Sequence, residues 1–457
     1  MKYRGVLKMT NYIRVFALAI LSLLSANVLA TNGYFSHGFG TANKALAGAG
    51  TALPQEAMIV ANNPAGLVHV GTRFDIGAAL FTPERGFADI DPDNFTVFPT
   101  TAAGQEVESN KEWFLIPGMA LSYQLDDKNA LGFAMYGNGG MNSTYRGKDT
   151  GNTGIFGTTN NNKDTGVDMM QLFMNFSYAR KINESLSLGA SALYVFQRFS
   201  ARGFDVFNPF RQYDNPLDDN EGISNQGNDY GHGFGVKAGL IYKFNEKFSI
   251  AASYQPEVRM TKFQRYKYLF AEEGGFNVPA TATIGTAIKF NSRSSVVFDV
   301  QRIWYADIVS VGNPMTLLNT CDSSPGRINC LGGSNGAGFG WRDMTIYKLG
   351  YQHNWSKDLI LRAGYSYGEQ PIPRDSVMFN IVAPAVLEEH FTVGFTQKMS
   401  KDTDLNFEMM YAPNNPVIGG AGPNGALLGG FTFADQYSGV ELFMDQFEIE
   451  MSYSWKF

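Results

Sequence analysis

The chain has 457 residues, of which 14% are aromatic and 50 are glycine, and its formal charge at pH 7 is −6. This acidic balance gives no electrostatic case for binding nucleic acid, because phosphate neutralisation needs clustered Lys and Arg. The mean hydropathy of −0.16 suits a soluble protein. It equally suits a membrane β-barrel, in which every second residue faces the lumen and the average apolarity falls.

The N-terminus is predicted to be a secretory signal peptide, residues 1–30. Four basic residues, Lys2, Arg4, Lys8 and Arg14, precede the apolar run Val15 to Leu24, and residues 28–30 offer a small-residue cleavage site. A transmembrane anchor is the weaker interpretation, because a membrane helix needs about 20 apolar residues. Removing the segment takes away four positive charges and no acidic ones, which changes the formal charge from −6 to −10.

Residues 31–72 show no strand alternation and are predicted to form a compact segment before the first strand. They contain a Gly/Ala-rich stretch from Lys44 to Gly50, followed by Asn63, Pro64, Ala65 and Gly66. A flexible periplasmic tail is the alternative, but such tails are usually poor in apolar residues. This segment has several, among them Leu46, Leu53 and Leu67.

Residues 73–457 are predicted to form an all-β fold, a transmembrane antiparallel β-barrel. Apolar and polar residues alternate at 170–178, 186–196, 278–290, 347–355, 359–367 and 405–411. The C-terminal twelve residues alternate without exception: Phe447, Ile449, Met451, Tyr453, Trp455 and Phe457 interleave with Gln446, Glu448, Glu450, Ser452, Ser454 and Lys456. A strand places these two sets on opposite faces of a sheet. A half-buried strand of a soluble sandwich is the alternative.

Short polar turns and long connections alternate along the predicted barrel. Six short turns lie near residues 126–129, 183–185, 245–247, 291–294, 356–358 and 400–402. Seven long connections lie near residues 84–109, 146–167, 201–230, 264–276, 306–341, 370–385 and 412–436. The pattern predicts about fourteen strands, with both ends on the periplasmic side. Barrel side chains alone cannot fill so wide a lumen, so residues 31–72 are predicted to plug it.

Three motifs near the mature N-terminus resemble the FadL family of outer-membrane transporters for long-chain fatty acids and other hydrophobic compounds. They are the run Gly33 to Gly40, the Ala-Gly-Ala-Gly at Ala47 to Gly50, and Asn63-Pro64-Ala65-Gly66 leading into Arg73-Phe74-Asp75. The resemblance implies a location in the bacterial outer membrane, a fourteen-stranded barrel, and a hatch formed by residues 31–72 that contains the Asn63 motif. It also implies contact with outer-membrane lipid and lipopolysaccharide, and recognition of Phe457 by the barrel assembly machinery.

Two aromatic-rich loops are predicted to be exposed and to capture ligand. One holds Phe204, Phe207, Phe210 and Tyr213, and the other holds Phe263, Tyr266, Tyr268, Leu269, Phe270 and Phe276. By their order they resemble the two loops that form the family's first hydrophobic groove, although the rings can instead pack only against one another. Nearby cations either pair with a carboxylate or are ordinary solvated charges; they are Arg211, Lys262, Arg265 and Lys267.

A glycine-rich run interrupts the third predicted strand at Gly137, Asn138, Gly139 and Gly140. Glycine inside a strand marks a bulge or a bend. By position this run matches the family's inward kink of the third strand, which opens a lateral hole in the barrel wall. A bulge that only relieves curvature is the alternative.

Other candidate chemistry is weak. Cys321 and Cys330 are predicted to form a disulfide in one exported loop, since two sulfurs are too few for a zinc site. Gly364 to Gly368 fits the G-x-S-x-G pattern, but that motif requires a strained turn into a helix, and Ser366 lies within an alternating strand. The five histidines show no metal-ligand spacing. No enzyme, metal or cofactor is therefore expected.

The sequence thus predicts a passive uptake channel for hydrophobic small molecules, with capture by the aromatic loops and release through the third-strand kink. A general porin and a barrel used for adhesion or phage attachment are the alternatives. The sequence does not choose among fatty acids, alkanes and aromatic hydrocarbons, because no single Arg or Lys stands out as lying in the lumen.

Overall fold

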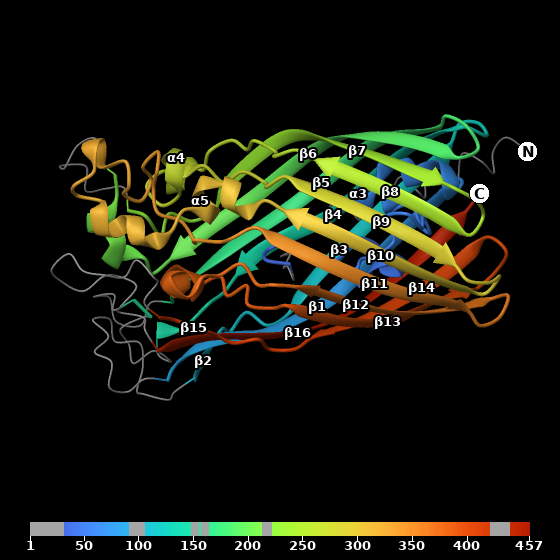
Figure 1. The fold of residues 1–457 in the computed structure, drawn as a ribbon. Coiled ribbons are helices and arrows are strands. Elements are labelled where there is room, and N and C mark those ends of the chain that lie inside the picture. The colour runs from blue at the N-terminus through green and yellow to red at the C-terminus, as the bar shows by residue number, and fades with distance from the viewer. Residues whose placement is uncertain (1–31, 91–105, 148–154, 157–163, 213–221, 421–438) are drawn as a thin grey trace, which may run out of the picture.

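The computed structural model describes residues 32–90, 106–147, 155–156, 164–212, 222–420 and 439–457. Their strands form one antiparallel sheet, which closes into a barrel where the first strand pairs with the last (Figure 1). In these residues the barrel has fourteen strands: β1 Arg73–Asp89, β3 Phe114–Gln124, β4 Asn129–Asn142, β5 Gly166–Lys181, β6 Leu186–Arg202, β7 Asp229–Lys243, β8 Phe248–Gln255, β9 Thr281–Lys289, β10 Ser294–Ile303, β11 Met344–Asn354, β12 Leu359–Gly368, β13 Glu389–Lys398, β14 Thr403–Ala412 and β16 Val440–Lys456. Two short strands, β2 Glu106–Glu108 and β15 Val417–Ile418, pair with β1 and β16.

The terminal strand β16 shows which face of the barrel is polar. Phe447 and Met451 are 37% and 50% exposed, whereas Gln446 and Glu448 are each only 2% exposed. The apolar face therefore points outward and the polar face points into the lumen. This is the reverse of a soluble sandwich, so the predicted membrane barrel is confirmed and its soluble alternative is excluded.

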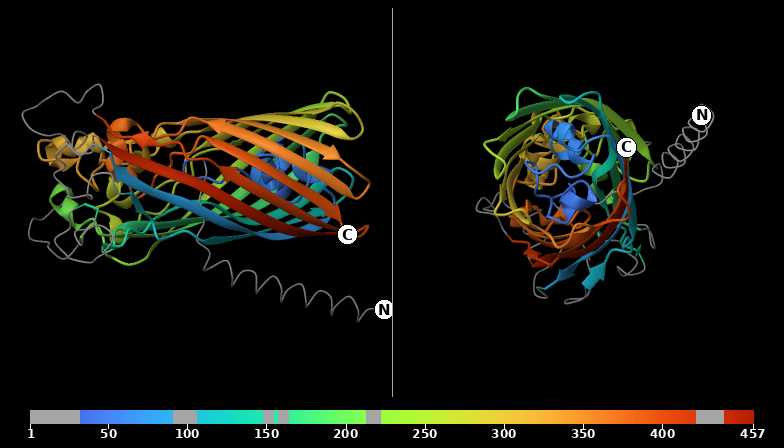
Figure 2. Two further views of the ribbon diagram at one scale, coloured as in Figure 1. Left: turned by 90° about the horizontal axis from the view of Figure 1, so that it is seen from below. Right: turned by 90° about the vertical axis from the view of Figure 1, so that its right-hand side faces the viewer.

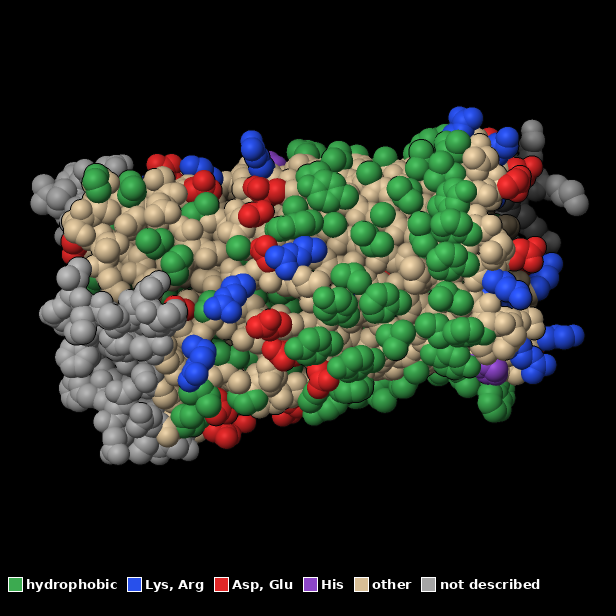
Figure 3. Space-filling model, viewed as in Figure 1, with side chains coloured by type: hydrophobic (Ala, Val, Ile, Leu, Met, Phe, Trp, Pro, Cys, Tyr) green, Lys and Arg blue, Asp and Glu red, His purple; other side chains and the backbone are tan. Residues whose placement is uncertain are grey.

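Apolar side chains cover much of the outer surface of the barrel (Figure 3). Large exposed hydrophobic residues come from many strands, including Leu121, Phe176, Phe234, Ile284 and Phe391. Charged side chains gather at the short-turn end and again toward the loop end (Figure 3). An apolar band between two charged zones is the surface that a bilayer requires. Among the described residues, no helix is long and apolar enough to cross a membrane.

The predicted strand number and the six short turns are confirmed, but some strand boundaries differ. Strand β1 continues past residue 84 to Asp89, because it keeps pairing with β16 and then pairs with β2. Strand β9 begins at Thr281 and not at residue 278, because Val278 instead forms a bridge to Val258. The alternation of apolar and polar residues within one strand cannot predict these boundaries, because they depend on which other segments pair with the strand.

The long connections gather at the end of the barrel opposite the short turns (Figure 1). Their described helices are η3 Asp205–Phe210, η4 Gln264–Tyr266, α4 Ala271–Gly274, η5 Tyr305–Asp307, α5 Val309–Gly312, η6 Met315–Thr320, η7 Pro325–Arg327, η8 Arg374–Ser376 and α6 Val377–Asn380. The predicted disulfide between Cys321 and Cys330 is confirmed. Next to it, the Leu331 carbonyl accepts a hydrogen bond from the Gln212 N–H at 2.7 Å, which joins two connections.

Residues 32–72, called here the N-terminal segment, lie inside the ring of strands (Figure 2). They contain α2 Thr41–Lys44, α3 Ile59–Asn62 and η1 Pro64–His69, and most of their side chains are buried. The predicted signal peptide, residues 1–30, lies outside the described residues and stays a prediction.

Candidate functional site

Asn63 anchors the centre of the N-terminal segment. Its Oδ1 accepts a hydrogen bond from the Ala65 N–H at 3.0 Å, which caps η1. Its Nδ2 donates to the carbonyl oxygens of Thr51 and Leu240, at 3.2 and 3.0 Å. Leu240 belongs to β7, and a Cβ on the neighbouring Gly239 would overlap the Asn63 amide. This one side chain therefore ties the segment to the barrel wall, at a place that only glycine permits.

The other residues of the predicted hatch motif are buried around this anchor. Pro64, Ala65 and Gly66 form the start of η1, and Pro64 occupies the first helical position, where proline is best tolerated. The Ala65 side chain is fully buried, in a cluster that also contains Leu46 of the segment and Ile241 of β7. The motif thus packs against the wall as well as capping a helix.

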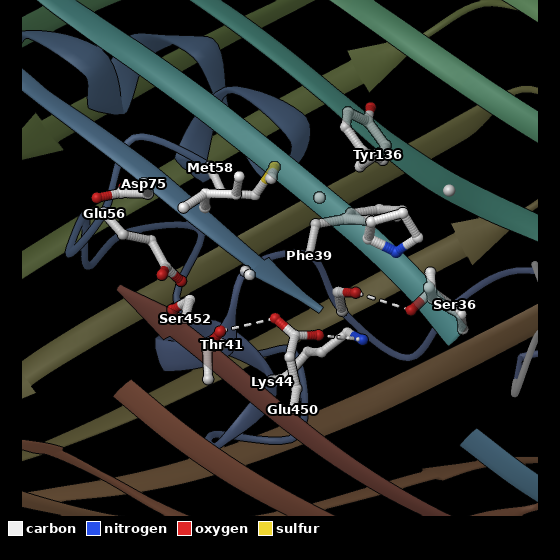
Figure 4. Close-up of a pocket in the computed structure, with 18 residues that line it drawn as sticks. Ser36, Phe39, Thr41, Lys44, Glu56, Met58, Asp75, Tyr136, Glu450 and Ser452 are labelled. Carbon is white, nitrogen blue, oxygen red and sulfur yellow. Dashed lines mark hydrogen bonds and ion pairs between the residues drawn. The ribbon is translucent and has the colours of Figure 1, made fainter. Parts of the chain in front are cut away.

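Ionic contacts fasten the first half of the segment. Lys44 Nζ lies 2.8 Å from Glu448 Oε1 and 2.7 Å from Glu450 Oε2, both on β16. Thr41 Oγ1 donates to Glu450 Oε1 at 2.7 Å (Figure 4). From β11, Lys348 Nζ donates to the His37 carbonyl at 2.8 Å. Breaking one partner of such a buried pair costs several kcal/mol.

Glu56 is a buried carboxyl group within the segment, only 4% exposed. Its Oε1 accepts hydrogen bonds from the backbone N–H groups of Ala42 and Asn43, at 3.0 and 3.2 Å. Burial, and then repulsion from Asp75, raise the pKa of Glu56 to about 7, although Arg73 acts in the opposite direction. This group therefore titrates near neutral pH.

The glycine-rich run of β4 is where the barrel wall meets the tip of the segment. The Gly140 N–H donates to the Tyr34 carbonyl at 3.1 Å, and the Ser36 N–H donates to the Asn138 carbonyl at 2.9 Å. A Cβ on Gly139 would overlap the Tyr34 carbonyl oxygen. The register of β4 on β5 shifts between residues 137 and 139, so the predicted bulge is present.

Strands β3 and β4 stop pairing beside this bulge. Their register ends at Gly118 opposite Tyr136. Beyond it, β3 continues to pair with β1 as far as Phe114, and β4 continues to pair with β5 as far as Asn142. Residues 114–117 of β3 and 137–142 of β4, all of them described, therefore do not pair with each other.

A small cavity of about 40 Å³ lies at this separation (Figure 4). Phe39 and Met58 of the segment line it, with Ile116 and Gly118 of β3 and Tyr136 of β4. The rings of Phe39 and Tyr136 have centroids 4.7 Å apart. Its apolar side is next to the unpaired strands, and the carboxyl groups of Glu56, Asp75 and Glu450 lie on its polar side.

The rings of the two predicted capture loops are mostly buried, which corrects the expectation that they are exposed. Phe204 and Phe270 are each 4% exposed, and Phe207, Phe263 and Tyr266 are fully buried. Phe210 and Tyr268 are half-buried, Phe276 is buried, and Tyr213 lies outside the described residues. The loops fold back over the barrel mouth, so the rings pack against wall residues that the sequence pattern did not connect to them.

Phe199 of β6 is the centre of this packing. Its ring centroid lies 5.7, 4.8 and 4.6 Å from those of Phe263, Tyr266 and Phe270. Beside these rings is a second cavity of about 40 Å³, whose lining is mostly apolar. The residues that line it are Val167, Phe199, Phe204, Phe207, Leu269, Phe270, Ser310, Leu331, Ala337, Gly338, Phe339, Phe379 and Val382. Ligand pockets usually measure roughly 300–1,000 Å³, so a ligand can enter only if side chains move.

A further aromatic group joins the loops to the N-terminal segment. The ring centroid of Tyr34 lies 5.9, 5.0 and 5.7 Å from those of Phe276, Tyr305 and Trp341. The Tyr305 hydroxyl donates to the Asn32 carbonyl at 2.6 Å. In the sequence, Tyr305 and Trp341 are marked only as aromatic residues in or beside a long connection.

Arg85 of β1 is a buried cation at a third cavity of about 40 Å³. Its guanidinium donates to the carbonyls of Pro83 and Asn142 and lies over the Phe114 ring, 5.7 Å from the centroid. Among the described residues no carboxylate forms an ion pair with it. Most of the other residues that line this cavity are apolar, among them Phe81, Trp341 and Val382, and two are the polar residues Asn142 and Gln446. The expectation that no arginine stands out in the lumen was therefore wrong.

Of the four cations predicted beside the capture loops, Lys262 and Arg265 are exposed, and Arg211 and Lys267 are half-buried. Lys262 pairs with Glu273 at 3.1 Å, and both side chains are exposed. Arg211 and Lys267 lie over the ring of Tyr268, at 5.7 and 4.7 Å. The exposed Arg265 donates to the Gln226 carbonyl at 2.9 Å. None of these four lines the cavity between the loops.

Ser366 lies on β12 with its Oγ 3.2 Å from Nδ1 of His390, on the neighbouring strand β13. Both side chains are buried in the lumen wall. The residue after Ser366 continues the strand, so the sharp strand-to-helix turn of a nucleophile elbow is absent at this position.

A much larger cavity of about 1280 Å³ opens at the short-turn end of the barrel. Leu53, Pro54 and Gln55 of the N-terminal segment line it, together with strand residues such as Arg362 and Lys398. The segment thus separates this chamber from the small cavities nearer the loops.

Comparison with known proteins relates this chain to outer-membrane transport proteins. A family model described as outer membrane protein transport protein (OMPP1/FadL/TodX) matches residues 21–417. The long-chain fatty acid transport protein of Escherichia coli (strain K12) is 23% identical over 431 residues, covering 86% of this chain and 89% of that protein. The counterpart from Salmonella typhi is 23% identical over 419 residues, covering 86% and 88%.

Solved structures share the fold. The toluene transporter TodX of P. putida superposes with a TM-score of 0.63 at 18% identity, covering 92% of this chain and 99% of that one. A FadL homologue of Pseudomonas aeruginosa also gives 0.63, at 14% identity, covering 93% and 100%. At these identities the likeness establishes the barrel architecture.

Changing Asn63 to Ala is expected to loosen the N-terminal segment, because three hydrogen bonds are lost and buried partners are left unsatisfied, at about 1–3 kcal/mol each. Liposome-swelling assays should show faster entry of small sugars than with the unchanged protein. Asn62→Ala is the matched control, because Asn62 is partly buried and donates only to the Phe39 carbonyl. Unchanged swelling and thermal stability for Asn63→Ala would contradict the anchoring role.

Glu56 is expected to make stability depend on pH. Its folded pKa of about 7 lies above the ordinary value of 4.5, so the folded protein holds an extra proton between these values. The free energy of unfolding should fall as pH rises through this window, by about 3 kcal/mol at most. Thermal unfolding in detergent from pH 4.5 to 8 measures this. Glu56→Gln keeps an acceptor oxygen and should flatten the profile; an equally steep profile would count against the assignment.

Proposed function

Because the chain belongs to the outer membrane protein transport family (OMPP1/FadL/TodX), we propose that it takes up long-chain fatty acids through a side opening in its barrel. The family is one of outer-membrane transport proteins, which confirms the expected location, a role in transport, and the expectation that the chain is not an enzyme. A relative named as a long-chain fatty acid transport protein supports the proposal that the ligand is a fatty acid. The route and the choice of fatty acid are our proposal.

Capture begins in the rings between the extracellular loops. A chain of about fifteen methylenes gains on the order of 10 kcal/mol on leaving water, at ~0.8 kcal/mol per CH₂. Binding therefore needs no energy source. The cavity lined by Phe204, Phe207 and Phe270 is apolar but small, so the loops open to admit ligand and then close over it.

Arg85 favours a carboxylate ligand over a neutral hydrocarbon. Its cavity combines one buried guanidinium with walls that are mostly apolar, which suits an acid head group followed by an alkyl chain. Val382 lines both this cavity and the one between the loops. A ligand can thus pass from the loop rings to Arg85 through side-chain movements alone.

Lateral release rests on the end of pairing between β3 and β4 at Gly118 and Tyr136. Strands β3 and β4 share no backbone hydrogen bonds there, and the apolar side of a small cavity lies beside them. The axial route is blocked by the N-terminal segment, which we propose is a hatch comprising residues 31–72. A shift of the Tyr34 to Phe39 stretch, which pairs with β4, would connect the lumen to the membrane. This filled lumen argues against a general porin.

The C-terminus suits a role in assembly. Phe457 is 71% exposed, while its N–H donates to the Thr72 carbonyl at 3.0 Å. We propose that the barrel assembly machinery recognises this ring, and that the outer surface near the loops contacts lipopolysaccharide.

Filling the cavity at the strand separation should block release. A Cβ on Gly118 would meet only Met58 Cε at 3.4 Å and the Met135 carbonyl oxygen at 3.9 Å, so a large side chain there fills space without displacing backbone. Gly118→Phe should reduce whole-cell uptake of radiolabelled oleate about tenfold or more, since a passive route is lost when its one exit closes. Gly118→Ala is the control and should transport normally.

Binding by the Gly118→Phe protein should be retained, because the loop cavity and Arg85 are unchanged. Normal uptake by this variant would contradict lateral release. Substituting Gly139 is a poorer test, since any side chain there also displaces Tyr34.

Changing Arg85 to Met should weaken binding of fatty acid by about ten- to a hundredfold, the effect of losing a charge-assisted hydrogen bond. Affinity for a neutral ligand of the same length, such as the alkane, should stay the same, and Arg85→Lys should restore part of the difference. Equilibrium binding of both radiolabelled ligands to purified barrel measures this. An equal loss for both ligands would contradict head-group recognition.

A further inference from the structure

His37 occupies an unusual position between the N-terminal segment and the barrel wall. Its side chain is fully buried, and neither ring nitrogen has a hydrogen-bond partner. Its Nε2 lies 3.7 Å from Oε1 of Glu408, on β14. Glu408 is also fully buried, and neither of its oxygens has a hydrogen-bond partner. Buried polar groups are rarely left this way unless something else satisfies them.

Glu448 of β16 completes a set of three possible ligands. One donor atom each from His37, Glu408 and Glu448 lie within 4.8 Å of one another, and all three side chains are buried. The two carboxylates project from adjacent strands, β14 and β16. The histidine approaches from the lumen side, so the three residues surround one point.

The charges at this point do not balance. Glu408, Glu448 and Glu450 lie around the ammonium group of Lys44, and a second ammonium group, that of Lys348, donates to the His37 carbonyl, so three carboxyl groups face two cations. If another cation binds Glu448, Lys44 can keep its ion pair with Glu450, in which Nζ lies 2.7 Å from Oε2. Burying excess carboxylates without a counter-charge is costly. A divalent cation would supply the missing charge.

We propose that His37, Glu408 and Glu448 form a binding site for a divalent transition-metal ion of the Zn²⁺ type. One imidazole and two carboxylates are a donor set that Zn²⁺ accepts, with a fourth position left for water or another group. The ion joins the N-terminal segment to β14 and β16, in addition to the Lys44 contacts.

No metal site is expected from the sequence, because the three ligands are far apart along the chain. Here one ligand comes from the N-terminal segment and two come from strands near the C-terminus. Only the closure of the barrel around the segment brings them together.

The test uses untagged full-length barrel in detergent, stripped with chelator and then equilibrated with Zn²⁺. Elemental analysis after gel filtration should find about one Zn²⁺ per chain, and calorimetry should give its affinity. Glu408→Gln and His37→Ala should each weaken binding at least about tenfold. His353→Ala is the matched control: His353 lies on β11, where it contacts Ser294 and not this cluster, and its removal should leave binding unchanged.

Heat-dependent gel mobility will confirm that each variant forms a closed barrel. Retention of no Zn²⁺ by the unchanged protein would overturn the proposal and indicate that protons alone balance the carboxylates. Equal affinity in folded Glu408→Gln protein would also overturn it, since the ion would then bind elsewhere.

Discussion

The structure depends on one constraint: a fourteen-stranded barrel encloses more space than its own inward side chains can fill. The inner face of β16 and its neighbours is polar, and those groups need partners once water is excluded. The N-terminal segment supplies them through Asn63, through the Lys44 pairs, and through backbone hydrogen bonds to β4. The N-terminal segment therefore fills the lumen and also supplies hydrogen-bond and ion-pair partners for the polar groups of the wall. These two requirements together explain its position inside the barrel.

This constraint also shapes the route of a ligand. The segment separates the chamber of about 1280 Å³ at the short-turn end from three much smaller cavities near the loops and the wall. Its tip pairs with β4 at the glycine run, close to the place where β3 and β4 stop pairing. We propose that a movement of the tip opens the wall at this place. A hydrophobic ligand that leaves sideways would enter lipid directly and would not cross the chamber at the short-turn end.

Much of the fold could be predicted from the sequence, because alternation with period two and the rhythm of short and long connections are local signals. The strand number, the short turns, the bulge at Gly137 to Gly139 and the Cys321–Cys330 disulfide all follow from such signals. Burial of the loop rings could not, since Phe207 and Phe263 pack against residues distant in sequence. The position of Arg85 could not be predicted for the same reason. In the sequence it is one arginine at the end of an alternating stretch, and only the closure of the barrel places it at a mostly apolar cavity.

The central claim is that ligand leaves the lumen between β3 and β4. A fatty acid carrying a photoreactive diazirine near its methyl end, added to cells and irradiated during uptake, tests this most directly. The account predicts that mass spectrometry will find the label on residues at the strand separation, such as Phe39, Ile116 or Tyr136. Label on Leu53, Gln55 or Arg362, which line the chamber at the short-turn end, would show an axial route and contradict the account.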